Sequence, residues 1–270
     1  MLHEQVLLIH GGHPERFTLP CNFQAGADGK LHALLIRGGE TIAVGSASED
    51  GSGARLITSR LDRPQPDVDE FSSLVRELGG PGELVIEESL AQTARDACKA
   101  IDGTVLHSHF ELALYRFEGE PPSDAYPDPA VREATEDDVS LIAGWSKAFD
   151  EETGYCRPQS PPDFDAIARS NIRICRVQVL EADGVPVAIG QRARNSRVGQ
   201  NRIGLIFVPP EHRSRGYAHR IVNSLVSSVL AEDAVPCLFT DRSDPISNRL
   251  YAHLSFVRTE FLVHLQPSAD

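Results

Sequence analysis

The chain carries hydrophobic residues in two different periods, and the change from one to the other marks the elements that we expect. After Ala218, isoleucine, valine and leucine residues recur at helical spacing, which predicts an amphipathic helix. On either side, the apolar run 203–208 belongs to a predicted strand at 201–208, and residues 236–240 predict a buried strand. The other elements expected between 130 and 265 are, in chain order, a strand at 131–134, a helix that starts at a Thr135 cap, a helix at 164–172, strands at 176–181 and 185–194, a helix at 246–254 and a strand at 256–265.

The part of the chain before residue 118 repeats the end of this order. It predicts a hairpin with Gly38-Gly39 at its tip, then a strand at 54–59, a helix at 68–78, a strand at 83–87, a helix at 90–101 and a long or broken strand at 104–117. The first part therefore reads β-β-β-α-β-α-β, and the second reads β-α-α-β-β-β-α-β-α-β. Because the two parts end in the same order of elements, we expect an α/β (α+β) protein built as a degenerate tandem repeat.

A proline-rich segment separates the two halves. Residues 118–129 contain four prolines together with several turn-forming residues, which cannot continue a helix or a central strand. We therefore expect domains at 1–120 and 130–270, joined by a linker at 121–129. Each half is of ordinary domain size.

The stretch 208–218, Val-Pro-Pro-Glu-His-Arg-Ser-Arg-Gly-Tyr-Ala, is the segment richest in chemistry. It joins a strand to a helix, and the first N–H groups of a helix lack internal partners and lie at the positive end of the macrodipole. Gly216 allows a close backbone approach, and Arg213 and Arg215 add positive charge. The sequence predicts a phosphate receptor here. At the corresponding place in the first half, 60–66 has two prolines and no glycine, which makes a poor cradle.

Composition narrows the class of protein. With 41% hydrophobic and 24% charged residues, the chain is typical of a soluble globular protein. It contains no apolar run of the roughly 18–20 residues that span a bilayer. Its first residues lack the basic and apolar segments of a signal peptide. We therefore expect a cytoplasmic protein that has no membrane partner.

The net charge argues against a nucleic-acid-binding protein, and the cysteine spacing argues against a protein with a metal site or a disulfide framework. The net charge of −13 disfavours a nucleic-acid partner. Residues 1–127 carry 10 basic and 20 acidic side chains (net −10), whereas 128–270 carry 16 and 19 (net −3), so an anionic ligand fits the second half better. The scattered cysteines have no metal-ligand or disulfide spacing, so no metal site is indicated and most should be small buried residues: Cys21, Cys98, Cys156, Cys175 and Cys237.

Two motifs together resemble the GCN5-related N-acetyltransferases, the GNAT superfamily. The first is Arg213-x-x-Gly216-x-Ala218, and the second is the stretch 244–256 with Asn248 and Tyr251. The resemblance covers residues 131–265 and is closest to a bacterial branch of predicted acetyltransferases with an FR47-like C-terminal region. It implies a tandem GNAT-like fold, with a mixed twisted sheet flanked by helices in each half, a degenerate N-terminal domain and an acetyl-CoA-binding C-terminal domain.

The resemblance also implies roles for individual residues. Tyr251 would be the general acid that protonates the departing coenzyme A thiolate, and the N–H of Val208 would meet the oxyanion. Asn248 would contact the cofactor. The backbone of Ile206, Phe207 and Val208 would pair with the pantetheine arm, and the pyrophosphate would lie against Arg213, Ser214, Arg215, Gly216, Tyr217 and Ala218. The expected partners are acetyl-CoA and a primary amine of a small molecule or peptide, which attacks the thioester directly.

Several points stay open at this stage. Strand 201–208 contains no carboxylate, so no general base is assigned, and the acidic run 150–152 either lines the acceptor side or is an exposed helix end. Ser255 replaces the family's usual glycine and should need an unfavourable backbone angle. Ser214 stands where glycine is common. A non-catalytic acyl-CoA-binding regulatory module and a transferase for a longer acyl group are alternatives. The first half could shape the acceptor site, pair with a second chain as a homodimer, or only stabilise the fold.

Overall fold

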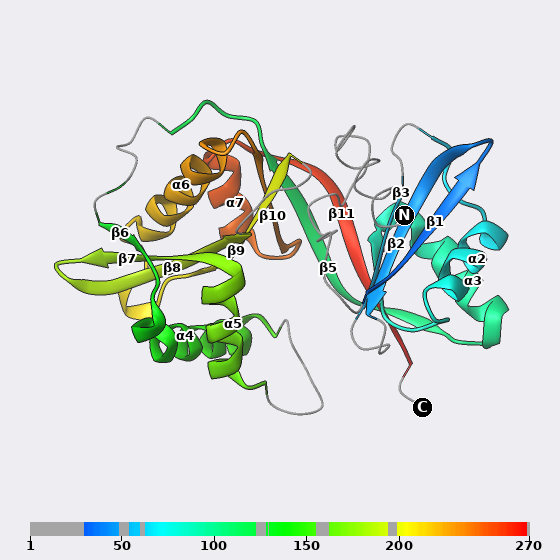
Figure 1. The fold of residues 1–270 in the computed structure, drawn as a ribbon, viewed down its shortest axis with the longest axis horizontal. Helices are drawn as coiled ribbons and strands as arrows, with labels where there is room; N and C mark the ends of the chain where they lie inside the picture. The colour runs from blue at the N-terminus through cyan, green and yellow to red at the C-terminus, as the bar shows by residue number, and fades with distance from the viewer. Residues whose placement is uncertain are drawn as a thin grey trace. The chain divides into compact units, whose positions relative to one another are not determined.

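The computed structural model describes residues 30–48, 54–59, 63–122, 128, 130–154, 162–193 and 199–268. The chain forms two compact units (Figure 1). The N-terminal unit holds the described residues of 1–116, 197–200 and 239–270, and the C-terminal unit holds those of 117–196 and 201–238. The boundary between the units falls within strand β10 (Val235–Asp241).

The N-terminal unit has a mixed sheet with the strand order β1-β2-β3-β4-β11-β5. Strands β1, β2 and β3 pair antiparallel, β4 is parallel to β3, and β11 is antiparallel to β4. Its elements are β1 (Lys30–Arg37), β2 (Glu40–Ser48), β3 (Arg55–Ser59), α2 (Val68–Glu77), β4 (Leu84–Glu87), α3 (Ala91–Asp102), β5 (Leu106–Phe117), α7 (Pro245–His253) and β11 (Phe256–Pro267).

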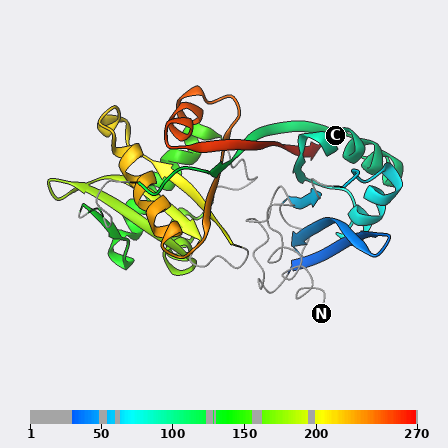
Figure 2. The same cartoon turned by 90° about the horizontal axis from the view of Figure 1, so that it is seen from above.

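The main core of this unit lies under helices α2 and α3, which cover one face of the strands (Figure 2). Phe71 of α2 and Ala94 and Cys98 of α3 are fully buried there against Ile57 of β3 and Leu265 of β11. Burial of a large apolar side chain contributes about 2 kcal/mol, so these helices are held mainly by their apolar faces. Strand β11, near the end of the chain, is part of the same core.

The C-terminal unit contains an antiparallel run of strands in the order β9-β8-β7-β6. Helices α4 and α5 cover one face of it, and α6 covers the other (Figure 1). Its elements are β6 (Val131–Glu133), α4 (Val139–Thr153), α5 (Phe164–Ile174), β7 (Cys175–Ala182), β8 (Val185–Ala193), β9 (Gln200–Phe207) and α6 (Tyr217–Leu230), and the first part of β10 follows.

Helix α6 lies very close to strand β8. A Cβ atom placed on Gly190 would come within 2.7 Å of Leu225 Cδ1 and 2.8 Å of Ile206 Cδ1, so any larger residue would require these side chains to shift. Residues 208–216, which include a short 3-10 turn at Pro210–His212, connect the end of β9 to the start of α6.

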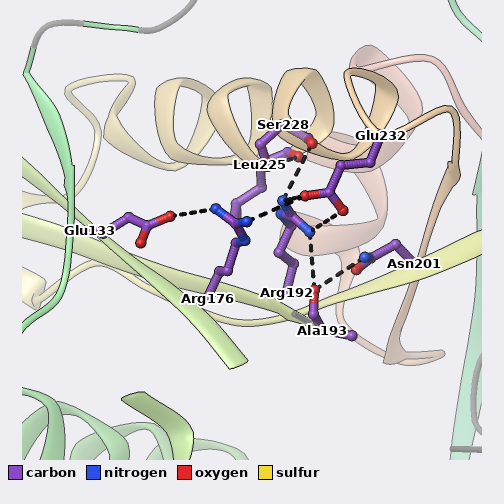
Figure 3. Close-up of polar contacts among 8 residues, drawn as sticks. All are labelled: Glu133, Arg176, Arg192, Ala193, Asn201, Leu225, Ser228 and Glu232. Atoms are coloured by element: carbon purple, nitrogen blue, oxygen red, sulfur yellow. Dashed lines mark hydrogen bonds and ion pairs between the residues drawn. The ribbon is translucent and has the colours of Figure 1, made fainter. Parts of the chain in front are cut away.

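A buried arginine fastens the far end of α6 to the same strand (Figure 3). The side chain of Arg192 is 1% exposed, and its Nη2 donates to Glu232 Oε1 at 2.6 Å. The guanidinium also holds the pKa of Glu232 below its usual range. Arg176 of β7 links Glu133 and Glu232 at the edge of this cluster. Because breaking a buried ion pair leaves an uncompensated charge, we regard the cluster as structural.

The helix starts follow from local sequence. Asp67, Asp163 and Asp244 cap α2, α5 and α7 by accepting N–H groups of the first turn. Thr135 and Asp138 form a capping box before α4, as the sequence predicted for Thr135. Helices α2, α5 and α7 therefore begin with a donor satisfied by an aspartate side chain, and the capping box at Thr135 belongs to the 3-10 turn Glu136–Asp138 that leads into α4.

The predicted order of elements is confirmed in both halves, with differences of one or two residues at most ends. The fold class, a mixed sheet flanked by helices, is confirmed as well. Cys98 and Cys237 are buried as expected and Cys175 is half-buried, whereas Cys21 and Cys156, like residues 60–62 and most of the linker, lie outside the described residues. No described helix has the length and apolar character to cross a membrane.

The two units do not coincide with the sequence domains 1–120 and 130–270. Helix α7 and strand β11 follow the linker in sequence, yet they pack with the N-terminal residues because β11 pairs with β4. The domain boundaries describe the repeated order of elements, and the units describe packing. The boundaries therefore stay a proposal.

Candidate functional site

Strand β9 contains a bulge shortly before the predicted phosphate turn. Ile189 of β8 pairs with Phe207, whereas Gln191, two residues later, pairs with Gly204, three residues earlier. The extra residue of β9 lies between these pairs, where Leu205 has a φ of 47°, in the left-handed region. A bulge takes backbone N–H and C=O groups out of the ladder. The bulge therefore interrupts the ladder between β8 and β9 at Leu205, and the pairing resumes at Phe207.

The predicted phosphate turn lies between β9 and α6, with an open helix start. Gly216 is the N-cap of α6 with a φ of 78°, and no side chain caps the helix. The first bond of the helix runs from Arg220 N to Gly216 O at 3.1 Å, so by helix geometry the N–H groups before Arg220 have no helical partner. Residues 213–216 are exposed, and a Cβ atom placed on Gly216 would meet no other side chain or distant backbone within 4 Å. This is the arrangement that binds anions at helix N-termini.

Two arginines of the turn behave differently. Arg213 donates from Nε to Val208 O at 2.9 Å and from Nη2 to both carboxylate oxygens of Glu152, at 2.8 and 2.6 Å. Arg215 is exposed and forms no side-chain hydrogen bond or ion pair with the described part of the chain. Arg215 is therefore available for an anion, whereas Arg213 is engaged in fixing the turn.

The second motif lies on α7, in the N-terminal unit. Tyr251 is 7% exposed, and its ring lies between those of Tyr115 and Phe256, with centroids 6.1 and 5.9 Å away. The Tyr115 hydroxyl donates to Asn248 Oδ1 at 2.8 Å. Asn248 Nδ2 in turn donates to the carbonyl of Asp241 at 2.9 Å, which closes the loop between β10 and α7. The side chain of Asn248 is thus already hydrogen-bonded at both ends.

The environment of Tyr251 keeps its phenol neutral. Burial raises the pKa of the phenol above its ordinary value, and the carboxylate of Asp244 raises this pKa further. None of the hydrogen bonds among the described residues involves the Tyr251 hydroxyl. The residue is therefore a protonated donor, but a weaker acid than an ordinary tyrosine.

Comparison with known proteins shows that this chain shares its fold with solved acetyltransferase structures. Residues 189–262, from β8 to β11, match the family described as FR47-like protein. An acetyltransferase of the GNAT family from Colwellia psychrerythraea is 11% identical, with a TM-score of 0.60 and coverage of 98% of this chain and 97% of its own. A GCN5-related N-acetyltransferase from Kribbella flavida is 14% identical, with a TM-score of 0.55 and coverage of 100% and 96%. A tandem GNAT protein from the clavulanic acid biosynthesis pathway, solved without acetyl-CoA, is 11% identical, with a TM-score of 0.58 and coverage of 100% and 96%.

The chain has the tandem GNAT fold. At these identities the likeness concerns the fold, and the matched family segment contains both motifs that the sequence singled out. No curated protein matches the chain.

Within this GNAT fold the candidate residues form two groups. Ile206, Phe207 and Val208 and the turn 213–218 lie together in the C-terminal unit, whereas Asn248 and Tyr251 lie together in the N-terminal unit. The backbone angle expected at Ser255 is confirmed by a φ of 62°, and Ser214 has a φ of 61°. Both serines therefore occupy the left-handed region that favours glycine.

Sequence reasoning missed two features of the candidate site. The bulge at Leu205 has no sequence signal, because leucine rarely adopts a positive φ. The acidic run 150–152 left two readings open, and the structure shows Glu152 as an exposed residue in the last turn of α4 that pairs with Arg213. The spacing of the two residues along the chain gives no hint of this pair.

Proposed function

We propose that the protein is an acetyl-CoA-dependent N-acetyltransferase whose acceptor is a primary amine of a small molecule or peptide. The observation that supports this most is the open start of α6 at Gly216, in the connection that follows the bulged strand β9 and inside the segment that matches the FR47-like family. A diphosphate needs several converging donors, and this turn offers N–H groups, a glycine and Arg215 in an exposed position.

The residues fit coenzyme A as follows. The N–H groups of the turn, from Ser214 to Ala218, would hold the pyrophosphate, and Arg213 would fix the turn. The backbone of Ile206, Phe207 and Val208, beside the bulge, would pair with the pantetheine arm, and the N–H of Val208 would face the thioester oxygen. Acetyl-CoA, when bound, supplies an activated acyl group to an amine.

Tyr251 would be the general acid and Asn248 a cofactor contact. The raised pKa of Tyr251 ensures that the phenol carries its proton at neutral pH. The ordinary pKa of a thiol is about 8.5, so complete transfer of that proton to a thiolate is uphill. The role fits best as a hydrogen bond to sulfur that strengthens as negative charge develops. Asn248 would have to exchange one of its present hydrogen bonds to reach a ligand.

A screen of amines and peptides, read out by thiol release from acetyl-CoA, tests this function. We expect release with at least one acceptor by the wild type and none by Gly216→Glu, which places negative charge in the turn. If the wild type binds acetyl-CoA but acetylates no acceptor, the function is wrong and a non-catalytic module is correct. That second candidate is favoured by one observation, the absence of any carboxylate in β9.

A further inference from the structure

Arg213 joins the phosphate turn to helix α4 through a single carboxylate. One nitrogen, Nη2, contacts both oxygens of Glu152, while Nε holds the carbonyl of Val208. The carboxylate lies one residue before the end of α4, and Arg213 lies 61 residues later in the chain. The guanidinium therefore ties together the end of β9, the turn and α4.

A second contact brings α4 to the same place. Trp145 of α4 packs against Phe207 at the end of β9, with ring centroids 6.1 Å apart. The guanidinium of Arg213 lies 5.9 Å from the centroid of the same Phe207 ring. The apolar contact places α4 against β9, and the ion pair then fixes the orientation of the Arg213 side chain.

We propose that Glu152 is a positioning residue for coenzyme A, acting through Arg213. This inference rests on the proposed function. Glu152 holds the Arg213 side chain against Val208 O, and so keeps the backbone of the turn in the conformation that presents its N–H groups to the pyrophosphate. A preformed receptor binds more tightly because less order has to be imposed on binding.

The proposal predicts that neutralising Glu152 changes the affinity for acetyl-CoA in the direction opposite to that expected from charge repulsion alone. Glu152 is a negative charge beside a turn that binds an anion, so by Coulomb repulsion alone its neutralisation would tighten binding. If Glu152 instead positions Arg213, neutralisation lets the arginine leave Val208 and weakens binding. Glu151 offers a matched control, because it carries the same charge one residue away and pairs with Lys147 on its own helix rather than with the turn.

The experiment compares the full-length wild type, Glu152→Gln and Glu151→Gln by calorimetric titration with acetyl-CoA at low salt. The two partners of the pair are 45% and 43% exposed, which limits the effect. We expect Kd to rise about threefold to fivefold for Glu152→Gln, the range of a well-formed exposed pair. For Glu151→Gln we expect Kd to stay unchanged or to fall. Melting temperatures of all three show whether any change reflects lost stability.

A coupled variant shows whether Glu152 acts through Arg213. Arg213→Lys keeps the charge but removes the Nε donor, and in this background Glu152→Gln should cause no further weakening. In acetyl-transfer assays Glu152→Gln should raise KM for acetyl-CoA and leave kcat unchanged, whereas a loss of folded protein would lower the apparent kcat.

The outcomes separate the two proposals. If the wild type does not bind acetyl-CoA, both the proposed function and this inference are wrong. If the wild type binds but Glu152→Gln binds as tightly as Glu151→Gln, or more tightly, only the positioning role is wrong. Full additivity of the Glu152 and Arg213 changes would also overturn it.

Discussion

Helices α2 and α6 occupy the same place in the repeated order of elements, but their first turns differ. At α2, Asp67 accepts the N–H of Glu70 at 2.9 Å and the Glu70 carboxylate accepts the N–H of Asp67 at 3.1 Å, while Glu70 also pairs with Arg37. At α6, Gly216 replaces the cap, and no acidic residue lies in the first turn. One helix start is closed by its own carboxylates, and the other is open.

This difference explains in physical terms why only one half should bind a phosphate group. A receptor needs unpaired donors and no competing negative charge. In α2 the Asp67 carboxylate accepts the N–H of Glu70, and the first turn carries Asp69 and Glu70, so an anion would meet repulsion. The same fold can thus keep or lose the site by changing one helix cap.

The largest effect is expected from closing the open helix start. Gly216→Glu places a negative charge beside the pyrophosphate, and it should weaken acetyl-CoA binding by at least about a hundredfold, or roughly 3 kcal/mol. Because the φ of Gly216 is 78°, Gly216→Ala is the control for backbone strain alone. Calorimetric titration of both variants should show a much smaller loss for alanine. Equal losses would mean that charge plays no part in the site.

The second-largest effect is expected at Tyr251, in the helix that follows α6 in the chain. Helix α7 carries Tyr251, whereas α3, its counterpart in the first half, contains no tyrosine. Tyr251→Phe should lower kcat at least about tenfold, within the usual range for an acid, with little change in Kd for acetyl-CoA. Steady-state kinetics together with titration check this. Unchanged turnover would exclude Tyr251 as an essential acid.

Removing the side-chain cap of α2 should lower the free energy of unfolding and leave the affinity for acetyl-CoA unchanged. Asp67→Ala removes the cap of α2 and should cost about 1 kcal/mol of unfolding free energy, measured by urea denaturation. The affinity for acetyl-CoA should not change, because the open start at Gly216 is untouched. A loss of affinity in this variant would show that the first half takes part in coenzyme binding.

The smallest effect is expected where the halves differ in a turn residue. Gly103 follows α3 with a φ of 88°, whereas Ser255 follows α7 with a φ of 62°. Ser255→Gly should stabilise the protein by up to about 1 kcal/mol, because a left-handed conformation costs serine more than glycine. The reverse change, Gly103→Ser, should destabilise it by a similar amount. Urea denaturation of both variants measures the pair.

Much of the fold could be predicted because its signals are local. The periods of apolar residues located nearly every described element, and Thr135 was recognised as a cap from its own neighbours. The turn at Gly216 was found in the same way, since glycine between a strand and a helix has a direct conformational meaning. These features depend on a few adjacent residues.

Contacts between distant segments could not be predicted in this way. Tyr115 reaches Asn248 across 133 residues, and β11 pairs with β4 of the first half, although its sequence position suggested only a final strand. The register and the partner of a strand depend on which faces of the elements are buried together. The sequence alone does not show which faces these are.

The sequence by itself determined the order of elements, the repeat and the glycine turn, because each arises from local periodicity or local backbone freedom. Only the tertiary structure decided the bulge at Leu205, the pair of Arg213 with Glu152 and the hydrogen bonds of Asn248. These depend on how β9 meets β8, how α4 packs on β9 and how the loop before α7 closes. Such packing is settled only when the whole chain has folded.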